Sequence, residues 1–160
     1  AHAGISYVPQ TRDIFPTLTV EENLFVGLKA RPRTALDEAY TLFPRLAERR
    51  HNMGGRLSGG EQQMLSTARS FLGQPSILLL DEPLEGLAPV ISRELMSGLS
   101  QLKAQGHMTI LLVEQRVASA LEIADQVLVL ERGRLAWEGS VTNWRQNPSL
   151  TDLYLGVSEA

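Results

Sequence analysis

The chain has 160 residues, of which 43% are hydrophobic and 21% charged, so it is long enough for one domain with a core. Its formal net charge of −3 gives no basic field for nucleic acid, and its lack of cysteine excludes disulfides and thiolate zinc sites. No apolar run approaches the ~18 residues of a membrane span, and the first residues lack the charged-then-apolar pattern of a signal peptide.

The first half of the chain is predicted to be mostly helical. A short strand is expected at residues 4–8. Thr19 and Glu22 have the spacing of a capping box, which predicts a helix that starts after Thr19. A second helix is expected over residues 34–43, and Pro44 should break or restart it.

The second half alternates between helices and strands. Helices are predicted over three ranges, which are 59–72, 90–105 and 116–123. Strands that are buried on both faces are predicted at two apolar runs, 77–80 and 109–113. This alternation favours an α/β fold with a parallel sheet.

The last thirty-odd residues follow a different pattern. Arg132-Gly133 is typical of a hairpin turn, which should join strands at 126–130 and 135–138. The tail over 141–155 is predicted to be helical, with an interruption at Pro148.

A glycine pair and a hydroxyl stand at the start of the helix predicted over 59–72. Ser58 and Glu61 have capping-box spacing, and such a helix start presents N–H groups at the positive end of the helix dipole. Gly59 and Gly60 would let a phosphate come close to the backbone, and the Ser58 hydroxyl can add a hydrogen bond. The plainer interpretation is a capped helix after a glycine turn, but the carboxylates downstream favour a phosphate site.

Two carboxylates, Asp81 and Glu82, directly follow the apolar run at 77–80. At the carboxyl end of a parallel strand they would face the crevice where ligands bind. Asp81 is placed to hold magnesium, and Glu82 to orient and deprotonate an attacking water. The alternative is a solvated turn helped by Pro83, which the four aliphatic residues before the acids disfavour.

Two glutamines also follow predicted strands. Gln10 follows the strand at 4–8, where its side chain can touch a metal or a water, although such a residue is most often only part of a loop. Gln115 follows the strand at 109–113, and a side-chain amide there can contact a γ-phosphate. An amide does not titrate near neutral pH as histidine does, and a polar helix cap is an equal alternative for Gln115.

Taken together, these motifs resemble the nucleotide-binding subunit of an ABC transporter. The ABC signature is resembled by Leu57-Ser58-Gly59-Gly60-Glu61-Gln62-Gln63, and Walker B by Leu78-Leu79-Leu80-Asp81-Glu82-Pro83. The Q-loop is resembled by Tyr7-Val8-Pro9-Gln10. The D-loop position holds Leu84-Glu85-Gly86-Leu87-Ala88-Pro89, and the switch position, usually a histidine after a strand, holds Val113-Glu114-Gln115. The resemblance covers nearly the whole chain.

Within that family, several stretches resemble the branched-chain amino acid uptake group. They are Leu18-Thr19-Val20-Glu21-Glu22-Asn23-Leu24, Leu42-Phe43-Pro44-Arg45-Leu46, Gly86-Leu87-Ala88-Pro89, Val113-Glu114-Gln115 and Tyr154-Leu155-Gly156. Glutamine in place of the switch histidine is familiar in that group, and related importers for urea or short amides share these features. The group usually has serine and then leucine after Asp-Glu-Pro, where this chain has Leu84 and Glu85.

The resemblance implies an α/β, P-loop NTPase-like ABC ATPase core with a mostly parallel sheet and an inserted helical subdomain. It implies three parts: the helical subdomain at about 15–57, the signature, Walker B and switch region at about 58–131, and the hairpin and helical tail at 132–160. The two lysines, Lys29 and Lys103, do not stand in the P-loop pattern G-x-x-x-x-G-K-[ST]. We therefore expect a partial nucleotide-binding domain that lacks its N-terminal third, begins inside a larger domain and is inactive alone.

The resemblance also implies a role for each candidate residue. ATP would lie between Walker A of one subunit and the signature of a second one. Asp81 would hold Mg²⁺ through water, with Gln10 coupling this metal site to the membrane subunit. Glu82 would be the general base and Gln115 a second catalytic residue. The nucleotide-binding set is completed by Ser58, Gly59, Gly60 and Glu61, of which the first three would grip the γ-phosphate of the partner's ATP.

The function implied is ATP hydrolysis that powers uptake of branched-chain amino acids or related small solutes. Its partners would be a second nucleotide-binding subunit, the same or different, and transmembrane permease subunits, with no nucleic acid. The location would be cytoplasmic, peripheral on the inner face of the cell membrane. One alternative is a catalytically incompetent fragment that only contributes the signature in trans, and another is a soluble ABC-type ATPase of DNA repair or translation.

Overall fold

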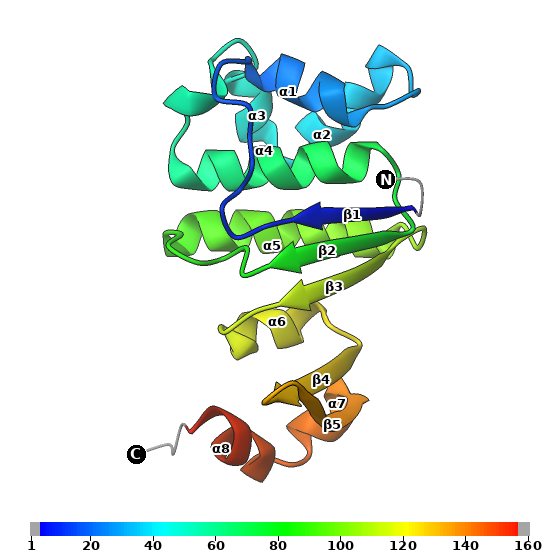
Figure 1. The fold of residues 1–160 in the computed structure, drawn as a ribbon, viewed down its shortest axis with the longest axis vertical. Coiled ribbons are helices and arrows are strands. Elements are labelled where there is room, and N and C mark those ends of the chain that lie inside the picture. Colours follow the sequence, from blue (N-terminus) through cyan, green and yellow to red (C-terminus); the bar gives the residue numbers. More distant parts are fainter. Residues whose placement is uncertain (1–3, 157–160) are drawn as a thin grey trace. The chain divides into compact units, whose positions relative to one another are not determined.

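The computed structural model of the protein describes residues 4–156 (Figure 1). Over this range the chain divides into two compact units, of which the first ends at Arg116 and the second begins at Val117. In the described range, no helix combines the length and the apolar character that a bilayer span requires.

A three-stranded parallel sheet forms the centre of the described part of the first unit. Its strands are β1 (Ile5–Val8), β2 (Ile77–Asp81) and β3 (Thr109–Val113), in the order β1-β2-β3. The register pairs Val8 with Leu80 and Asp81 with Val113, so the carboxyl ends of all three strands lie at the same end of the sheet. Parallel strands need long crossover connections, which here are helical, and this confirms the predicted α/β class.

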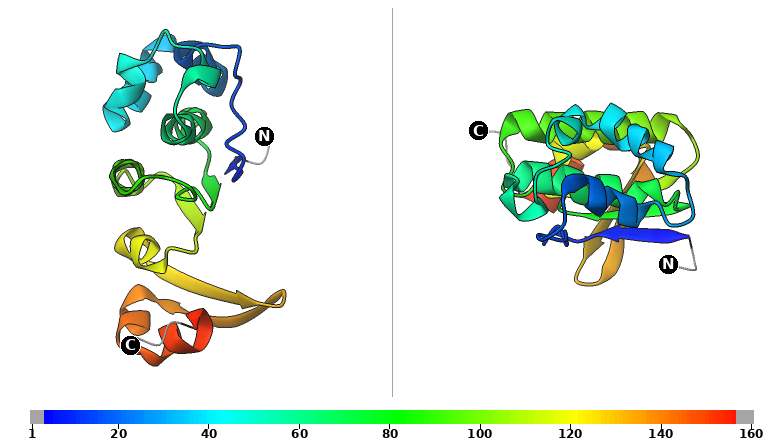
Figure 2. Two further views of the ribbon diagram at one scale, coloured as in Figure 1. Left: turned by 90° about the vertical axis from the view of Figure 1, so that its left-hand side faces the viewer. Right: turned by 90° about the horizontal axis from the view of Figure 1, so that it is seen from above.

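Two long helices, α4 (Gly59–Leu72) and α5 (Pro89–Ala104), lie on the same side of the sheet (Figure 2). The side chains of Val8, Leu78 and Leu80 are buried toward these helices. Leu65 of α4 and Leu99 of α5 are also fully buried, so the core of the unit lies between the sheet and the helices.

The opposite face of the sheet is exposed. Tyr7, Leu111 and Val113 are 54%, 46% and 53% exposed, because successive side chains of a strand point to opposite faces and both long helices cover only one. The prediction that the strands at 77–80 and 109–113 are buried on both faces is therefore wrong for this chain. Their continuous apolar sequence is that of a doubly covered strand, but only one face is covered.

The residues between β1 and α4 form a small helical layer next to α4 (Figure 1). Its elements are α1 (Val20–Gly27), η1 (Arg33–Ala35), α2 (Leu36–Leu42), α3 (Pro44–Glu48) and η2 (Gly54–Arg56). The helix restarts at Pro44, as predicted, because proline is favoured at the first position of a helix. The predicted capping box also forms, since Thr19 Oγ1 accepts from the Glu22 N–H at 3.2 Å.

The second unit contains a hairpin and three helices in its described part. Its elements are α6 (Val117–Ile123), β4 (Gln126–Glu131), β5 (Arg134–Ser140), α7 (Val141–Arg145) and α8 (Ser149–Leu155). The strands β4 and β5 are antiparallel, and the turn residues Arg132 and Gly133 both have positive φ, as the predicted turn requires. Trp137 packs edge-on against Trp144 with ring centroids 5.2 Å apart.

Candidate functional site

The carboxylate pair lies where the sequence predicts, at the carboxyl end of the central strand. Asp81 is the last residue of β2, and the Glu82 N–H donates to the carbonyl of Val113 at 2.9 Å. Glu82 has a φ of 45°, in the left-handed region that residues other than glycine rarely adopt. Such a conformation costs on the order of 1–3 kcal/mol and persists where the surrounding structure imposes it, often at functional sites.

Both carboxylate oxygens of Glu82 accept hydrogen bonds from side-chain amides. Gln10 Nε2 donates to Oε2 at 3.2 Å, and Gln115 Nε2 donates to Oε1 at 2.8 Å. Gln10 Nε2 also donates to the carboxylate of Glu85. Gln10 follows β1 and Gln115 follows β3, so the ends of all three strands contribute to one cluster, and three of the predicted site residues are brought together.

Asp81 has a partner that no sequence motif indicates. The Tyr7 hydroxyl donates to Asp81 Oδ2 at 3.0 Å, and this hydrogen bond is the main reason why the pKa of Tyr7 is raised above 10.0. Tyr7 pairs in register with Leu79, two residues before Asp81, so both side chains project from the same face of neighbouring strands. The strand register is the signal that could have predicted this contact.

Asp81 and Gln10 carry the kinds of oxygen donor that a magnesium ion prefers. Mg²⁺ is commonly held by one or two carboxylates together with waters and substrate phosphates, and Asp81 and the amide oxygen of Gln10 are hard donors of this kind. In residues 4–156, no group of three or more histidine, aspartate or glutamate side chains is arranged to hold a metal ion. An ion here would therefore take its remaining oxygens from water or from a bound phosphate.

The glycine-containing motif forms the start of α4, as predicted. Ser58 Oγ accepts from the Glu61 N–H at 3.3 Å, and Glu61 Oε2 accepts from both the N–H and the hydroxyl of Ser58 at 2.8 Å. A Cβ at Gly60 would lie 2.4 Å from Cγ2 of Ile91, and one at Gly59 would lie 2.9 Å from Nη1 of Arg12. Ile91 thus disfavours a side chain at Gly60, whereas the flexible Arg12 side chain next to Gly59 can move aside.

Glu61 is held as an anion by its surroundings. Burial raises the pKa of this carboxyl, but hydrogen bonds from Ser58 and the charges of Arg49 and Arg45 lower it, and the net pKa lies below 4.5. Arg49 Nε lies 3.5 Å from Glu61 Oε1. In this structure Glu61 caps the helix, and its assignment to nucleotide binding stays a prediction.

The loop between β1 and α1 contacts both motifs. Gln10 binds Glu82, and the guanidinium of Arg12 lies against Gly59. Further along the loop, Arg69 of α4 donates to the carbonyl of Asp13 and lies 4.7 Å from the ring centre of Phe15. In the described range, no hydrogen bond or ion pair joins Ser58 or Glu61 directly to Asp81 or Glu82, so this loop is the bridge between the motifs.

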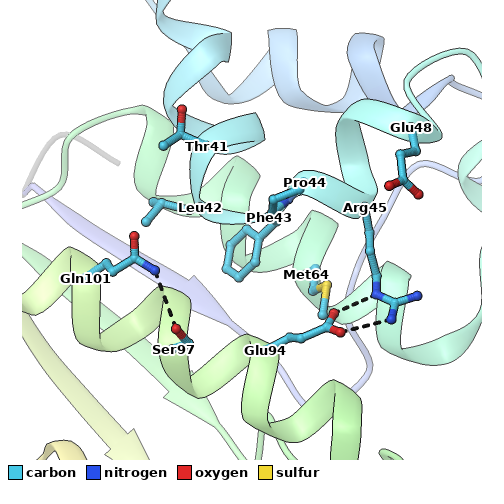
Figure 3. A pocket seen from close by; sticks show the side chains of 10 residues that line it. All are labelled: Thr41, Leu42, Phe43, Pro44, Arg45, Glu48, Met64, Glu94, Ser97 and Gln101. Carbon is cyan, nitrogen blue, oxygen red and sulfur yellow. Dashed lines mark hydrogen bonds and ion pairs between the residues drawn. The ribbon is translucent and has the colours of Figure 1, made fainter.

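A hollow of about 500 Å³ lies elsewhere, between the α2–α3 segment and α5 (Figure 3). At one side of it Arg45 and Glu94 form an ion pair, with Nε–Oε2 at 2.6 Å and Nη2–Oε1 at 2.9 Å. The ring of Phe43 lies over the notch left by Gly98, where a Cβ would be 2.5 Å from the ring. None of the predicted site residues lines this hollow, so we interpret it as part of a packing interface between helices and not as the reaction site.

A model of a protein family described as ABC transporter matches residues 1–85, which is more than half of the chain. The chain belongs to the ABC transporter family. BraG, a high-affinity branched-chain amino acid transport ATP-binding protein of Pseudomonas aeruginosa, is 43% identical to this ABC family chain over 157 residues. LivF, a probable branched-chain amino acid transport ATP-binding protein of Archaeoglobus fulgidus, is 37% identical over 158 residues.

Each of these two alignments covers 96% of this chain and 67% of the relative, so the chain spans about two thirds of their length. A solved structure of an ATP-binding subunit of an ABC transporter has a TM-score of 0.80 and 25% identity, and covers 96% of this chain and 68% of that one. The predicted ABC ATPase fold is thereby confirmed.

Proposed function

We propose that the chain is part of an ATP-hydrolysing subunit that powers uptake of branched-chain amino acids through an ABC transporter. The observation that carries the proposal is the cluster at the carboxyl ends of the strands, where Gln10 and Gln115 hold the carboxylate of Glu82. The proposed solute rests on the names of BraG and LivF, both of which are branched-chain amino acid transport ATP-binding proteins.

In this proposal Glu82 takes the proton from the water that attacks the γ-phosphate. Its two carboxylate oxygens accept hydrogen bonds from the amides of Gln10 and Gln115. The bond from Gln10 is the longer one, so a water can take the place of the Gln10 amide while Gln115 holds the carboxylate in position. Gln115 cannot titrate near neutral pH, and its role is therefore to orient and not to transfer the proton. Asp81 and Gln10 would hold Mg²⁺, which supplies charge neutralisation at the phosphates when bound.

The start of α4 serves a nucleotide on a second subunit. The N–H groups of Gly59 and Gly60 stand at the positive end of a 14-residue helix, which favours a phosphate, and Ser58 adds its hydroxyl. Glu61 holds Ser58 in place through the capping box. The residues at about 15–57 form the subdomain that docks on the permease, those at about 58–131 the signature, Walker B and switch region, and 132–160 the hairpin and tail.

The location that follows from these partners is the cytoplasmic face of the membrane. The test is reconstitution of the transporter in vesicles with its permease and solute-binding component. We expect ATP hydrolysis to rise when leucine, isoleucine or valine is supplied, and urea or acetamide to have no effect. Stimulation by urea or acetamide alone would move the proposal to the amide importers, and the absence of any permease that co-purifies would contradict it.

A further inference from the structure

Two charged residues flank Gln115, and both bind the segment that follows Glu82. The Glu114 carboxylate accepts from the Leu84 N–H at 2.7 Å through one oxygen and from the Arg116 N–H at 3.1 Å through the other. A bond from a backbone N–H to a carboxylate is stronger than one between neutral groups. Leu84 is fully buried, so its N–H cannot donate to bulk water instead.

Arg116 extends the same contact toward α5. Its Nη1 donates to Oγ of the buried Ser92 at 3.1 Å, and its Nη2 lies 3.5 Å from the carbonyl of Leu87. The first of these is an ordinary hydrogen bond, and the second is at the outer limit of one. The end of β3 is thus tied at two points to the turn at residues 84–88 and at a third to the first turn of α5.

Gln115 lies in the chain between these two anchored residues. Its side chain is exposed, and its bond to Glu82 Oε1 at 2.8 Å crosses from the end of β3 to the end of β2. The residues on each side of it are fixed to the segment after Glu82, so the distance between the Gln115 backbone and Glu82 is fixed as well. A plain surface turn would need only the local bond from Arg116 to Glu114, not the one from Leu84, 30 positions away.

We infer that Glu114 and Arg116 are positioning residues, which fix the turn after Glu82 against the end of β3 and so hold Gln115 on the Glu82 carboxylate. The inference rests on the proposed hydrolysis of ATP by Glu82. Neither residue is proposed to contact the nucleotide. Loss of either one should therefore slow the chemical step and leave the binding of ATP nearly unchanged.

The experiment is steady-state ATP hydrolysis by the assembled transporter with Glu114→Ala, Gln115→Ala and the double variant in its ATP-binding subunit. We expect Glu114→Ala to lower kcat by about 10- to 100-fold, as a small misplacement of a catalytic group does, with little change in KM for ATP. Because Glu114 acts through Gln115, the double variant should be no slower than Gln115→Ala alone. Glu114→Gln, which keeps one oxygen for Leu84, should recover part of the loss.

Glu122→Ala, at an exposed glutamate of α6, is the matched control and should keep wild-type kcat. Wild-type kcat in Glu114→Ala, or losses in the two single variants that multiply in the double one, would overturn the inference. If Glu114→Ala does not fold, Arg116→Ala takes its place, alone and combined with Gln115→Ala. Wild-type kcat in Arg116→Ala, or losses that multiply in the double variant, would then overturn the inference. A Glu82→Gln variant that turns over normally would instead refute the proposed function, so the two failures are distinguishable.

Discussion

The Ser58 hydroxyl has two roles, because it caps α4 and is also proposed to bind a phosphate. It accepts a hydrogen bond from the Glu61 N–H and donates one to the Glu61 carboxylate. To donate to a phosphate at the start of α4, the hydroxyl must therefore give up its hydrogen bond to the Glu61 carboxylate. Thr19 forms the same capping box with Glu22 at the start of α1, and neither residue belongs to the two motifs. A comparison of the two capping boxes therefore separates the contribution of Ser58 to helix stability from its proposed contribution to phosphate binding.

We expect Ser58→Ala and Thr19→Ala each to lower the free energy of unfolding by about 1 kcal/mol, since each removes one helix cap. Only Ser58→Ala should also lower ATP hydrolysis by the assembled transporter. Urea unfolding and steady-state turnover measure the two effects. Equal turnover in both variants would show that Ser58 does no more than cap its helix.

The low pKa of Glu61 predicts a dependence of stability on pH. Its folded pKa lies below 4.5, so ionised Glu61 stabilises the fold above the unfolded pKa, and this contribution is lost as the pH falls through the folded pKa. Glu61→Gln should therefore lower the free energy of unfolding at pH 7 and have a diminishing effect below about pH 4.5. Urea unfolding of both proteins over this pH range is the measurement, and an equal effect at all pH values would contradict it.

At the scale of elements, the packing interface between α3 and α5 depends more on shape than on charge. Arg45 and Glu94 are 43% and 37% exposed in their side chains, and exposed ion pairs contribute only about 0–1 kcal/mol. Phe43 is 1% exposed and fills the space that the missing side chain of Gly98 leaves. We infer that this packing, and not the ion pair, sets how the helical layer rests on α5.

Gly98→Ala tests that inference. Alanine is favoured over glycine in a helix by about 1 kcal/mol, but its Cβ would lie 2.5 Å from the Phe43 ring, and overpacking costs about 1–3 kcal/mol. We expect a net loss of stability in thermal unfolding, while Ser97→Ala, at the exposed position next to it, stays within about 0.5 kcal/mol of wild type. A stabilised Gly98→Ala would show that the Phe43 ring can move away from α5 without loss of stability.

The elements that the sequence predicts well are those with local signals. Both capping boxes involve residues three positions apart, and the start of α3 follows from Pro44 alone. The contact of Tyr7 with Asp81 spans 74 positions, and that of Leu84 with Glu114 spans 30. Such contacts depend on strand register and on the path of a turn, which no local pattern specifies.

At the scale of the whole chain, we propose that the two motifs belong to separate half-sites. Asp81 and Glu82 lie at the ends of the strands, the signature residues lie at the start of α4, and the loop from Gln10 to Phe15 contacts both. The sequence places Gln10, Glu82 and Gln115 directly after predicted strands, and the three meet because parallel strands bring their carboxyl ends to the same end of the sheet. It does not predict the exposed sheet face, because an apolar strand carries no information about which elements cover it.

The sequence pattern also predicts what this chain does by itself. Its two lysines stand outside any P-loop pattern, so the isolated 160-residue chain lacks the lysine and the backbone amides that hold the β- and γ-phosphates. We expect it to release no phosphate from ATP beyond the rate of a Glu82→Gln variant in a malachite-green assay. Turnover that depends on Glu82 in the isolated chain would contradict this expectation.

We propose that Glu82 is the general base of ATP hydrolysis, and a comparison of wild type with Glu82→Gln in the assembled transporter tests this role most directly. Glutamine keeps the shape of the side chain but cannot accept the proton. We expect a turnover lower by about 10²- to 10⁴-fold, with ATP still bound, because general bases contribute that much to rate. Turnover of Glu82→Gln at the wild-type rate would contradict it.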